Sequence, residues 1–211
     1  MKTFNIKTII FDIDGTLMDT YTPSVEALRK ALLSVVGIDY KEDDLAFHFG
    51  IPLDDSLARL NIDNNFYPAI QSKIDEYYYR DERSKKVFPG IEKVLKVISE
   101  NDIVLGIVTS RDKREVEMDF NKLSISKHFD VIITADDAKR HKPHPDPIDK
   151  FIKVTNSSKS ETIYIGDTKY DCEAAHAAGI RFALAGWGAL NKEKIKADYF
   201  LSKPEDILKL I

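Results

Sequence analysis

Short apolar runs that recur along the chain constrain its fold more than any other feature of the sequence. Four of them are apolar on both faces and too short for helices, at residues 8–11, 103–108, 131–133 and 162–165. A weaker fifth run lies at residues 181–185. Patterns of helical spacing separate the runs, and such alternation indicates a parallel sheet with helices on both faces. We therefore expect an α/β fold with a doubly wound, Rossmann-like parallel sheet.

One interval breaks this alternation and predicts an inserted domain. Between residues 17 and 83 the sequence contains helical patterns but no convincing strand. We expect residues 17–83 to form a small α-helical cap, and residues 1–16 and 84–211 to form the α/β catalytic core. The apolar stripes of three cap helices are Val25, Leu28, Leu32 and Val35, then Leu53, Leu57 and Leu60, then Phe66, Ile70, Ile74 and Tyr77.

Composition limits the kinds of partner that this chain can have. Hydrophobic residues make up 43% of the chain, enough for a buried core, and the net charge of −4 gives no electrostatic reason to expect nucleic acid. The single cysteine, Cys172, cannot form a disulfide within the chain, as is typical of a reducing compartment. No stretch has the pattern of a signal peptide or a membrane span. We expect a cytoplasmic protein with no nucleic-acid or membrane partner, either a monomer or a homodimer.

Polar side chains follow the apolar runs where each expected strand ends. In an open parallel sheet these ends meet at one edge, and ligands bind there. Two carboxylates beside an apolar strand, Asp12 and Asp14, are costly unless they bind a metal or take part in chemistry. The side chains that the sequence places at this edge are Asp12, Asp14, Thr109, Ser110, Lys142, Asp167 and Asp171.

These residue types suit phosphoryl transfer. A carboxylate can attack phosphorus to form an acyl phosphate, and a neighbouring acid can protonate the leaving oxygen and then activate water. Mg²⁺ prefers oxygen ligands, while a lysine and a hydroxyl can hold the charged phosphate. The sequence therefore favours a hydrolase that acts on a small phosphorylated metabolite with Mg²⁺ as cofactor.

The same residues resemble the four motifs of the haloacid dehalogenase superfamily, in order along the chain. A lone D-x-D-G-T segment is a moderate signal, but four ordered motifs at expected strand ends are a strong one. The branch that the chain resembles has a helical cap after the first motif. The matching residues are the DIDGT segment at 12–16, then Thr109, then Lys142, then Asp167 with Asp171.

The resemblance implies roles for the first three motifs. Asp12 would be the nucleophile and a metal ligand, and Asp14 would be the general acid/base with its backbone carbonyl on the metal. Aspartate at position 14 also points to phosphate chemistry, because dehalogenases of this superfamily generally lack an acid/base there. Thr109 would bind the phosphoryl group with help from the Ser110 amide, and Lys142 would neutralise charge.

The fourth motif would complete the metal site. The resemblance implies that Asp167 binds Mg²⁺ and that Asp171 supports the ion directly or through water. Asp171 could instead be an ordinary first-turn acid, favoured by the helix dipole. His141 and His144 flank Lys142, but their spacing matches no zinc pattern, so we expect them to be loop histidines.

The substrate stays open at this point. Residues 48–53 resemble the Gly-x-Pro loop of phosphoglycolate phosphatase-like caps, which favours a phosphomonoester phosphatase of that kind. Residues 106–147 also resemble pyrophosphatase members, so an inorganic pyrophosphatase is an alternative. A β-phosphoglucomutase-type phosphomutase and a non-catalytic binding protein on the same scaffold are the others. On the cap, Arg59 and Lys73 are candidates for contacts with the substrate.

Overall fold

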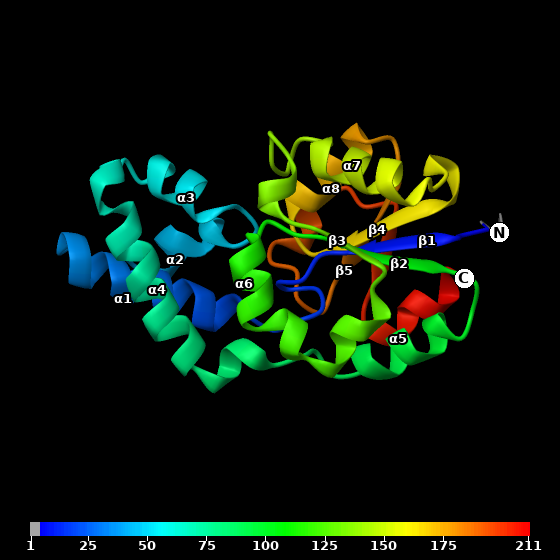
Figure 1. The fold of residues 1–211 in the computed structure, drawn as a ribbon, viewed down its shortest axis with the longest axis horizontal. Coiled ribbons are helices and arrows are strands. Elements are labelled where there is room, and N and C mark those ends of the chain that lie inside the picture. The colour runs from blue at the N-terminus through cyan, green and yellow to red at the C-terminus, as the bar shows by residue number, and fades with distance from the viewer. Residues whose placement is uncertain (1–4) are drawn as a thin grey trace.

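A six-stranded parallel sheet forms the core of the protein (Figure 1). The computed structural model describes residues 5–211, and residues 1–4, which we assigned to the core domain, lie outside this range. The strand order is β3-β2-β1-β4-β5-β6, so the first strand is central, and the expected doubly wound fold is confirmed. The strands are β1 (Thr8–Phe11), β2 (Val104–Val108), β3 (Val131–Ile133), β4 (Thr162–Gly166), β5 (Arg181–Ala185) and β6 (Tyr199–Leu201).

Alternate side chains of each strand pack into apolar clusters on opposite faces of the sheet. In β1, Ile9 and Phe11 belong to one cluster and Ile10 to the other. Because helices cover both faces, the strands read as continuous apolar runs rather than as alternating patterns. One face packs against α5 (Ile91–Ser99), α6 (Lys113–Met118) and the 3₁₀ helix Pro204–Lys209, and the other against α7 (Asp146–Thr155) and α8 (Lys169–Ala177).

Helices alone fill the insertion between β1 and α5. They enclose an apolar cluster of their own, and Figure 1 shows them beyond the carboxyl ends of the strands. The first helix ends at Gly37, whose φ of +74° is the left-handed conformation that glycine adopts without strain. These cap helices are α1 (Tyr21–Val36), α2 (Glu42–Leu45), α3 (Leu53–Arg59) and α4 (Tyr67–Arg80).

Two chain segments join the cap to the core, and they run side by side. The Asp19 amide donates to the Lys86 carbonyl at 2.8 Å, and the Phe88 amide donates to the Leu17 carbonyl at 3.0 Å. Leu17 and Met18 are fully buried in the core cluster. This antiparallel pair lies close to the expected domain boundaries, whose positions stay a prediction.

Among residues 5–211, none of the helices combines the length and the apolar content that a membrane span requires.

Helix α7 packs unusually close to β2, and this contact places the loop that carries Lys142. At Gly106 an added Cβ would lie 1.9 Å from a ring carbon of Phe151. Only glycine leaves room for the Phe151 ring, which is fully buried between the helix and the sheet. The loop immediately before α7 is therefore held at the edge of the sheet.

We expect Gly106→Ala to lower the free energy of unfolding by about 3 kcal/mol, because overpacking a dense core forces side chains and backbone to shift. Urea denaturation would measure the change. Gly179→Ala is the matched control, since Gly179 has a φ of +75° and an added Cβ there meets no described heavy atom within 4 Å. That control should cost only backbone strain, about 1 kcal/mol. An equal or smaller loss for Gly106→Ala would contradict the close contact.

Candidate active site

The structure brings the expected site residues together at the carboxyl edge of the sheet. Asp12 follows β1, Thr109 follows β2 and Asp167 follows β4. Asp171 lies in the first turn of α8, and Lys142 lies in the loop before α7. Four segments that are distant in sequence therefore meet in one place, although the roles of their residues stay predictions.

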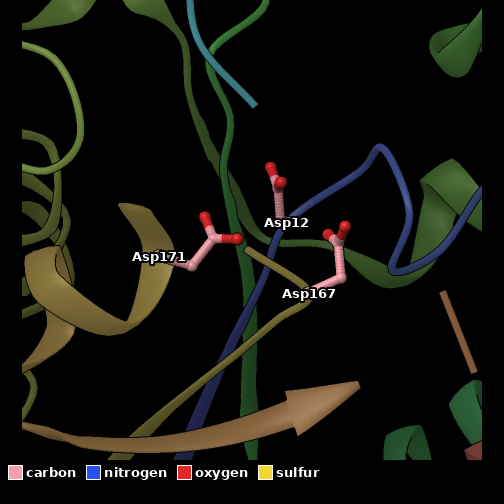
Figure 2. A group of neighbouring side chains, drawn as sticks. All are labelled: Asp12, Asp167 and Asp171. Atoms are coloured by element: carbon pink, nitrogen blue, oxygen red, sulfur yellow. The ribbon is translucent and has the colours of Figure 1, made fainter. Parts of the chain in front are cut away.

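Three buried carboxylates form the centre of the site (Figure 2). Asp12, Asp167 and Asp171 each offer an oxygen that lies within 4.8 Å of the others. Burial raises the pKa of Asp12 to about 7, even though Lys142 lowers it. Burial, with Asp171 and Asp12 nearby, raises the pKa of Asp167 well above its ordinary value. The cluster therefore carries more negative charge than its surroundings compensate.

Lys142 is the cation that this cluster contains. Its ammonium lies 2.6 Å from Asp171 Oδ1 and 3.1 Å from Asp12 Oδ1, and its side chain is only 1% exposed. Burial by itself would lower the pKa of Lys142, but Asp12 and Asp171 outweigh it, so the pKa is raised and the group stays charged. One ammonium thus faces three carboxylates.

Asp171 already has partners for both of its oxygens. Oδ2 accepts hydrogen bonds from the Thr168 amide at 2.9 Å and the Thr168 hydroxyl at 2.7 Å, which caps the start of α8. Oδ1 accepts from Lys142 and from the Tyr164 hydroxyl. This geometry favours an indirect role, in which Asp171 orients Lys142, over direct metal binding. The first-turn capping role and a role in the site are therefore compatible.

Asp12 and Asp167 fit a magnesium ion. Asp12 Oδ1 is buried and accepts no hydrogen bond within the described part of the chain, although it lies near the Lys142 ammonium. Asp167 Oδ1 accepts from the Thr16 hydroxyl at 3.0 Å, which fixes the carboxylate beside the first motif. Gly15 permits this approach, since a Cβ there would lie 2.2 Å from Asp167 Oδ2. Hard carboxylate oxygens with excess negative charge are what Mg²⁺ binds.

Asp14 turns away from the three carboxylates and pairs with Arg111. The two guanidinium nitrogens Nε and Nη2 of Arg111 each lie 2.7 Å from an oxygen of Asp14. The Thr20 hydroxyl, at the start of the cap, also donates to Asp14 Oδ1. Burial would raise the pKa of Asp14, but Arg111 and Thr20 outweigh it and lower the pKa overall. Asp14 is therefore ionised in this arrangement.

The residues after β2 contact both the site and the cap. Thr109 is buried, and its Oγ1 accepts a hydrogen bond from the Arg111 amide at 3.2 Å. The Ser110 hydroxyl donates to the Gly50 carbonyl of the cap at 3.0 Å, so only its backbone stays available for a phosphate. The same segment therefore carries an expected phosphate ligand and a contact that closes the cap.

A cavity lies between the cap and the core, and it reaches the carboxylate cluster at Asp12. Asp12, Asp14 and Arg111 line it from the core, and His48 and Tyr78 line it from the cap. The cap residues that we considered for substrate contacts lie elsewhere. The Arg59 guanidinium stacks 4.0 Å over the Phe47 ring, and Lys73 pairs with Glu76 at 2.8 Å. Neither of them lines the cavity.

Arg111 is the site residue that sequence reasoning missed. The segment from Thr109 to Asp112 reads as a helix N-cap, and Asp112 does cap α6 through a reciprocal bond with Glu115. That interpretation left no separate role for the arginine. The signal that could have found it is its place two residues beyond Thr109, where the chain still faces the edge of the sheet.

The chain matches a known protein family over the region that contains all four motifs. Residues 9–185 match the family described as haloacid dehalogenase-like hydrolase. Pyrophosphatase PpaX of Bacillus mycoides is 27% identical over 217 residues, which cover 98% of this chain and 97% of that protein.

Two solved structures relate to the substrate alternatives. A candidate phosphoglycolate phosphatase from Lactobacillus plantarum aligns with a TM-score of 0.87 at 27% identity, over 98% of this chain and 99% of that chain. A candidate β-phosphoglucomutase from Thermotoga maritima aligns with a TM-score of 0.72 at 28% identity, over 97% and 98%. Each similarity spans nearly the full length of both proteins, so cap and core are compared together.

We expect the protein in chelator to lose stability as the pH rises from 5 to 8. The native Asp12 carboxyl, with a pKa of about 7, binds its proton more tightly than the unfolded carboxyl, whose pKa is about 4. Low pH therefore stabilises the native state, and raising the pH through about 7 removes that stability. Thermal melting at several pH values would measure it.

Asp12→Asn provides the comparison, since it removes the charge while keeping the shape of the side chain. The melting temperature of this variant should fall less than that of the wild type between pH 5 and pH 8. Glu115, whose pKa burial also raises to about 7, is present in both proteins and so does not affect the difference. Parallel pH profiles for the two proteins would contradict the charge imbalance at the cluster.

Proposed function

The chain belongs to the haloacid dehalogenase-like hydrolase family and is a phosphatase, and we propose that it uses Mg²⁺ and an aspartyl-phosphate intermediate to hydrolyse a small phosphorylated metabolite. The observation that carries this proposal is the convergence of Asp12, Asp167 and Lys142 in one buried cluster beneath the cap cavity. A cytoplasmic location belongs to the same proposal.

Asp12 is the nucleophile in this proposal. Its carboxylate attacks phosphorus, the bond to the leaving oxygen breaks, and a phosphoryl group is left on Asp12. Lys142, 3.1 Å from Asp12 Oδ1, holds the carboxylate in place and offsets the charge of the incoming phosphate. The buried Thr109 hydroxyl and the Ser110 amide follow β2 at the same edge and bind phosphoryl oxygens.

Asp14 carries the protons in both halves of the reaction. Asp14 is ionised while it pairs with Arg111, so it must first leave that pair, which lets burial raise its pKa, and take up a proton. It then gives this proton to the leaving oxygen, and its carboxylate takes a proton from the water that attacks the phosphorylated Asp12. Water adds to phosphorus as the bond to the Asp12 oxygen breaks, so inorganic phosphate leaves and the carboxylate returns. Asp12 and Asp167 would hold Mg²⁺, which would supply positive charge that Lys142 alone does not provide.

Two substrate classes have support. The fold similarity to the Lactobacillus plantarum protein favours a phosphomonoester such as phosphoglycolate, while the similarity to pyrophosphatase PpaX favours inorganic pyrophosphate. Both compounds carry a second negatively charged group beside the phosphoryl group. The phosphomutase alternative has support from the Thermotoga maritima protein, which aligns less closely at a TM-score of 0.72.

A phosphate-release screen with Mg²⁺ tests the proposal directly. Phosphoglycolate, pyrophosphate, sugar phosphates and nucleotides form the panel, and we expect turnover of at least one of the first two. Asp12→Asn should lower turnover by more than about a thousandfold, because loss of a covalent nucleophile removes the whole pathway. Circular dichroism would show that the variant is folded.

Each alternative gives a different result in this screen. A phosphomutase would interconvert sugar phosphate isomers while releasing little phosphate, and a non-catalytic binding protein would hydrolyse nothing in the panel. Retained turnover in the Asp12→Asn variant would remove Asp12 from its role as the nucleophile.

We also expect Mg²⁺ to raise the melting temperature of the wild-type protein by about 5 °C when its concentration is a hundredfold above its dissociation constant. Asp167→Asn should abolish most of this shift, because it removes a charged ligand. Asp198→Asn is the control, since Asp198 pairs with His176 away from the carboxylates and should keep the full shift. Equal shifts in the two variants would argue against a metal at Asp167.

A further inference from the structure

Arg111 lines the cavity that also contains Asp12, so it lies near the site where a phosphoryl group would be transferred. We propose that Arg111 binds a second anionic group of the substrate and so selects compounds whose leaving group is itself negatively charged. This inference rests on the proposed function and narrows its substrate class. It assigns specificity to a core residue rather than to the cap.

Buried contacts fix the orientation of the Arg111 guanidinium. Nη1 donates to Asp119 Oδ1 at 2.6 Å, and the Asp119 side chain is only 2% exposed. Nη2 donates to the Tyr78 hydroxyl of the cap at 2.8 Å. Asp119 therefore fixes Nη1, while Nε and Nη2 form the edge of the guanidinium that faces Asp14. Because Asp14 and Arg111 both line the cavity, that edge lies at the substrate site.

Arg111 also supplies the one permanent positive charge among the described residues that line the cavity. The other basic side chain there is His48, and burial lowers its pKa to about 4, so it is neutral at physiological pH. The His48 ring is held by the Ser56 hydroxyl at 2.8 Å. Lys142 lies lower in the cluster, between Asp12 and Asp171, and serves the phosphoryl group.

The acidic groups on the cavity wall have partners of their own. Asp75 of the cap pairs with Arg114 at 2.7 Å, and Glu115 accepts a hydrogen bond from the Asp112 amide at 2.9 Å. A second anion on the substrate would therefore find one charged partner in the cavity, the guanidinium of Arg111.

The present partner of Arg111 shows what shape that anion should have. The Asp14 carboxylate occupies the Nε and Nη2 edge with two oxygens, one at 2.7 Å from each nitrogen. A substrate carboxylate or a second phosphoryl group offers the same pair of oxygens and can replace it. A neutral hydroxyl cannot compete with a carboxylate for a guanidinium. Replacement would also free Asp14 to turn toward the leaving oxygen.

A simpler role for Arg111 is to position Asp14 and nothing more. In that case loss of Arg111 would impair substrates whose leaving oxygens are equally basic to the same degree, because each of them needs the same general acid. A direct contact with the substrate predicts a loss that depends on the leaving group. The comparison of substrates therefore separates the two roles.

Kinetics of Arg111→Gln and Arg111→Lys test the proposal with three substrates. Pyrophosphate and phosphoglycolate carry a second anionic group. The third substrate, 2-hydroxyethyl phosphate, has an alkoxide leaving group like that of phosphoglycolate but no second anion. For Arg111→Gln we expect kcat/KM on the first two to fall about tenfold to a hundredfold more than on the third, as for loss of a charge-assisted bidentate contact. Arg111→Lys keeps the positive charge but cannot make two parallel hydrogen bonds, so its loss of kcat/KM should lie between those of the wild type and Arg111→Gln.

Arg140→Gln is the matched control. Arg140 pairs with Asp146 at 2.9 Å, and neither residue lines the cavity. Its loss removes one positive charge from the surface, so the ratio of kcat/KM between the substrates should stay within about twofold of the wild type. A ratio that moves as far in this control would assign the effect to net charge.

Binding gives a second readout that does not depend on turnover. In the Asp12→Asn background, calorimetry would compare phosphoglycolate with inorganic phosphate, with and without Arg111→Gln. We expect the added change to weaken phosphoglycolate about tenfold more than inorganic phosphate.

Equal losses on all substrates and equal weakening of both ligands would overturn the proposal and leave Arg111 as a positioning residue for Asp14. If Arg111→Gln does not fold, as circular dichroism would show, Arg111→Lys carries the same test. If the wild-type protein releases phosphate from none of the three compounds, the proposed function fails instead. The binding comparison would then still decide whether Arg111 recognises the second anion.

Discussion

The structure depends on keeping three carboxylates buried around one ammonium. Lys142 contacts Asp12 and Asp171 directly, yet burial still raises the pKa of Asp12 to about 7. Such a cluster destabilises the folded state, because the free energy lost when several like charges leave water exceeds the attraction that a single cation provides. It can persist because the surrounding sheet and helices are packed tightly enough to hold it. The excess of negative charge favours a bound cation such as the proposed Mg²⁺, and the positive charge of that ion would offset the repulsion between the cluster and a phosphate.

The fold builds this cluster from backbone features that serve two purposes. The capping bond of Thr168 starts α8 and also fixes one oxygen of Asp171, whose other oxygen holds Lys142. Gly106 lets α7 approach the sheet, and α7 follows directly on the loop of Lys142. The backbone at helix starts and strand ends thus also orients the charged side chains of the site.

The strand pattern predicted most of the core, because fully buried parallel strands differ from everything around them in apolar content. Strand β6 was not predicted, since it lies at the edge of the sheet and exposes Phe200 instead of forming a buried apolar run. Asp12, Thr109 and Asp167 were found because each follows a strand, and Lys142 was found by its place in the order of the motifs. Sequence patterns assigned no site role to Arg111, and they made Arg59 and Lys73 candidates for substrate contacts. Both outcomes have the same physical cause. Side-chain direction at the cap boundary depends on how two domains pack, and local periodicity carries no information about that packing.

The hydrogen bond between Thr20 and Asp14 links two parts of the molecule that otherwise belong to different domains. Thr20 directly precedes α1 and is fully buried, while Leu17 and Met18 before it are fixed in the core. Any rotation of the insertion about its antiparallel connection must move the Thr20 hydroxyl relative to the Asp14 carboxylate. A change in the position of the cap would therefore change the hydrogen bonding of Asp14 directly, through the short stretch of chain between Leu17 and Thr20.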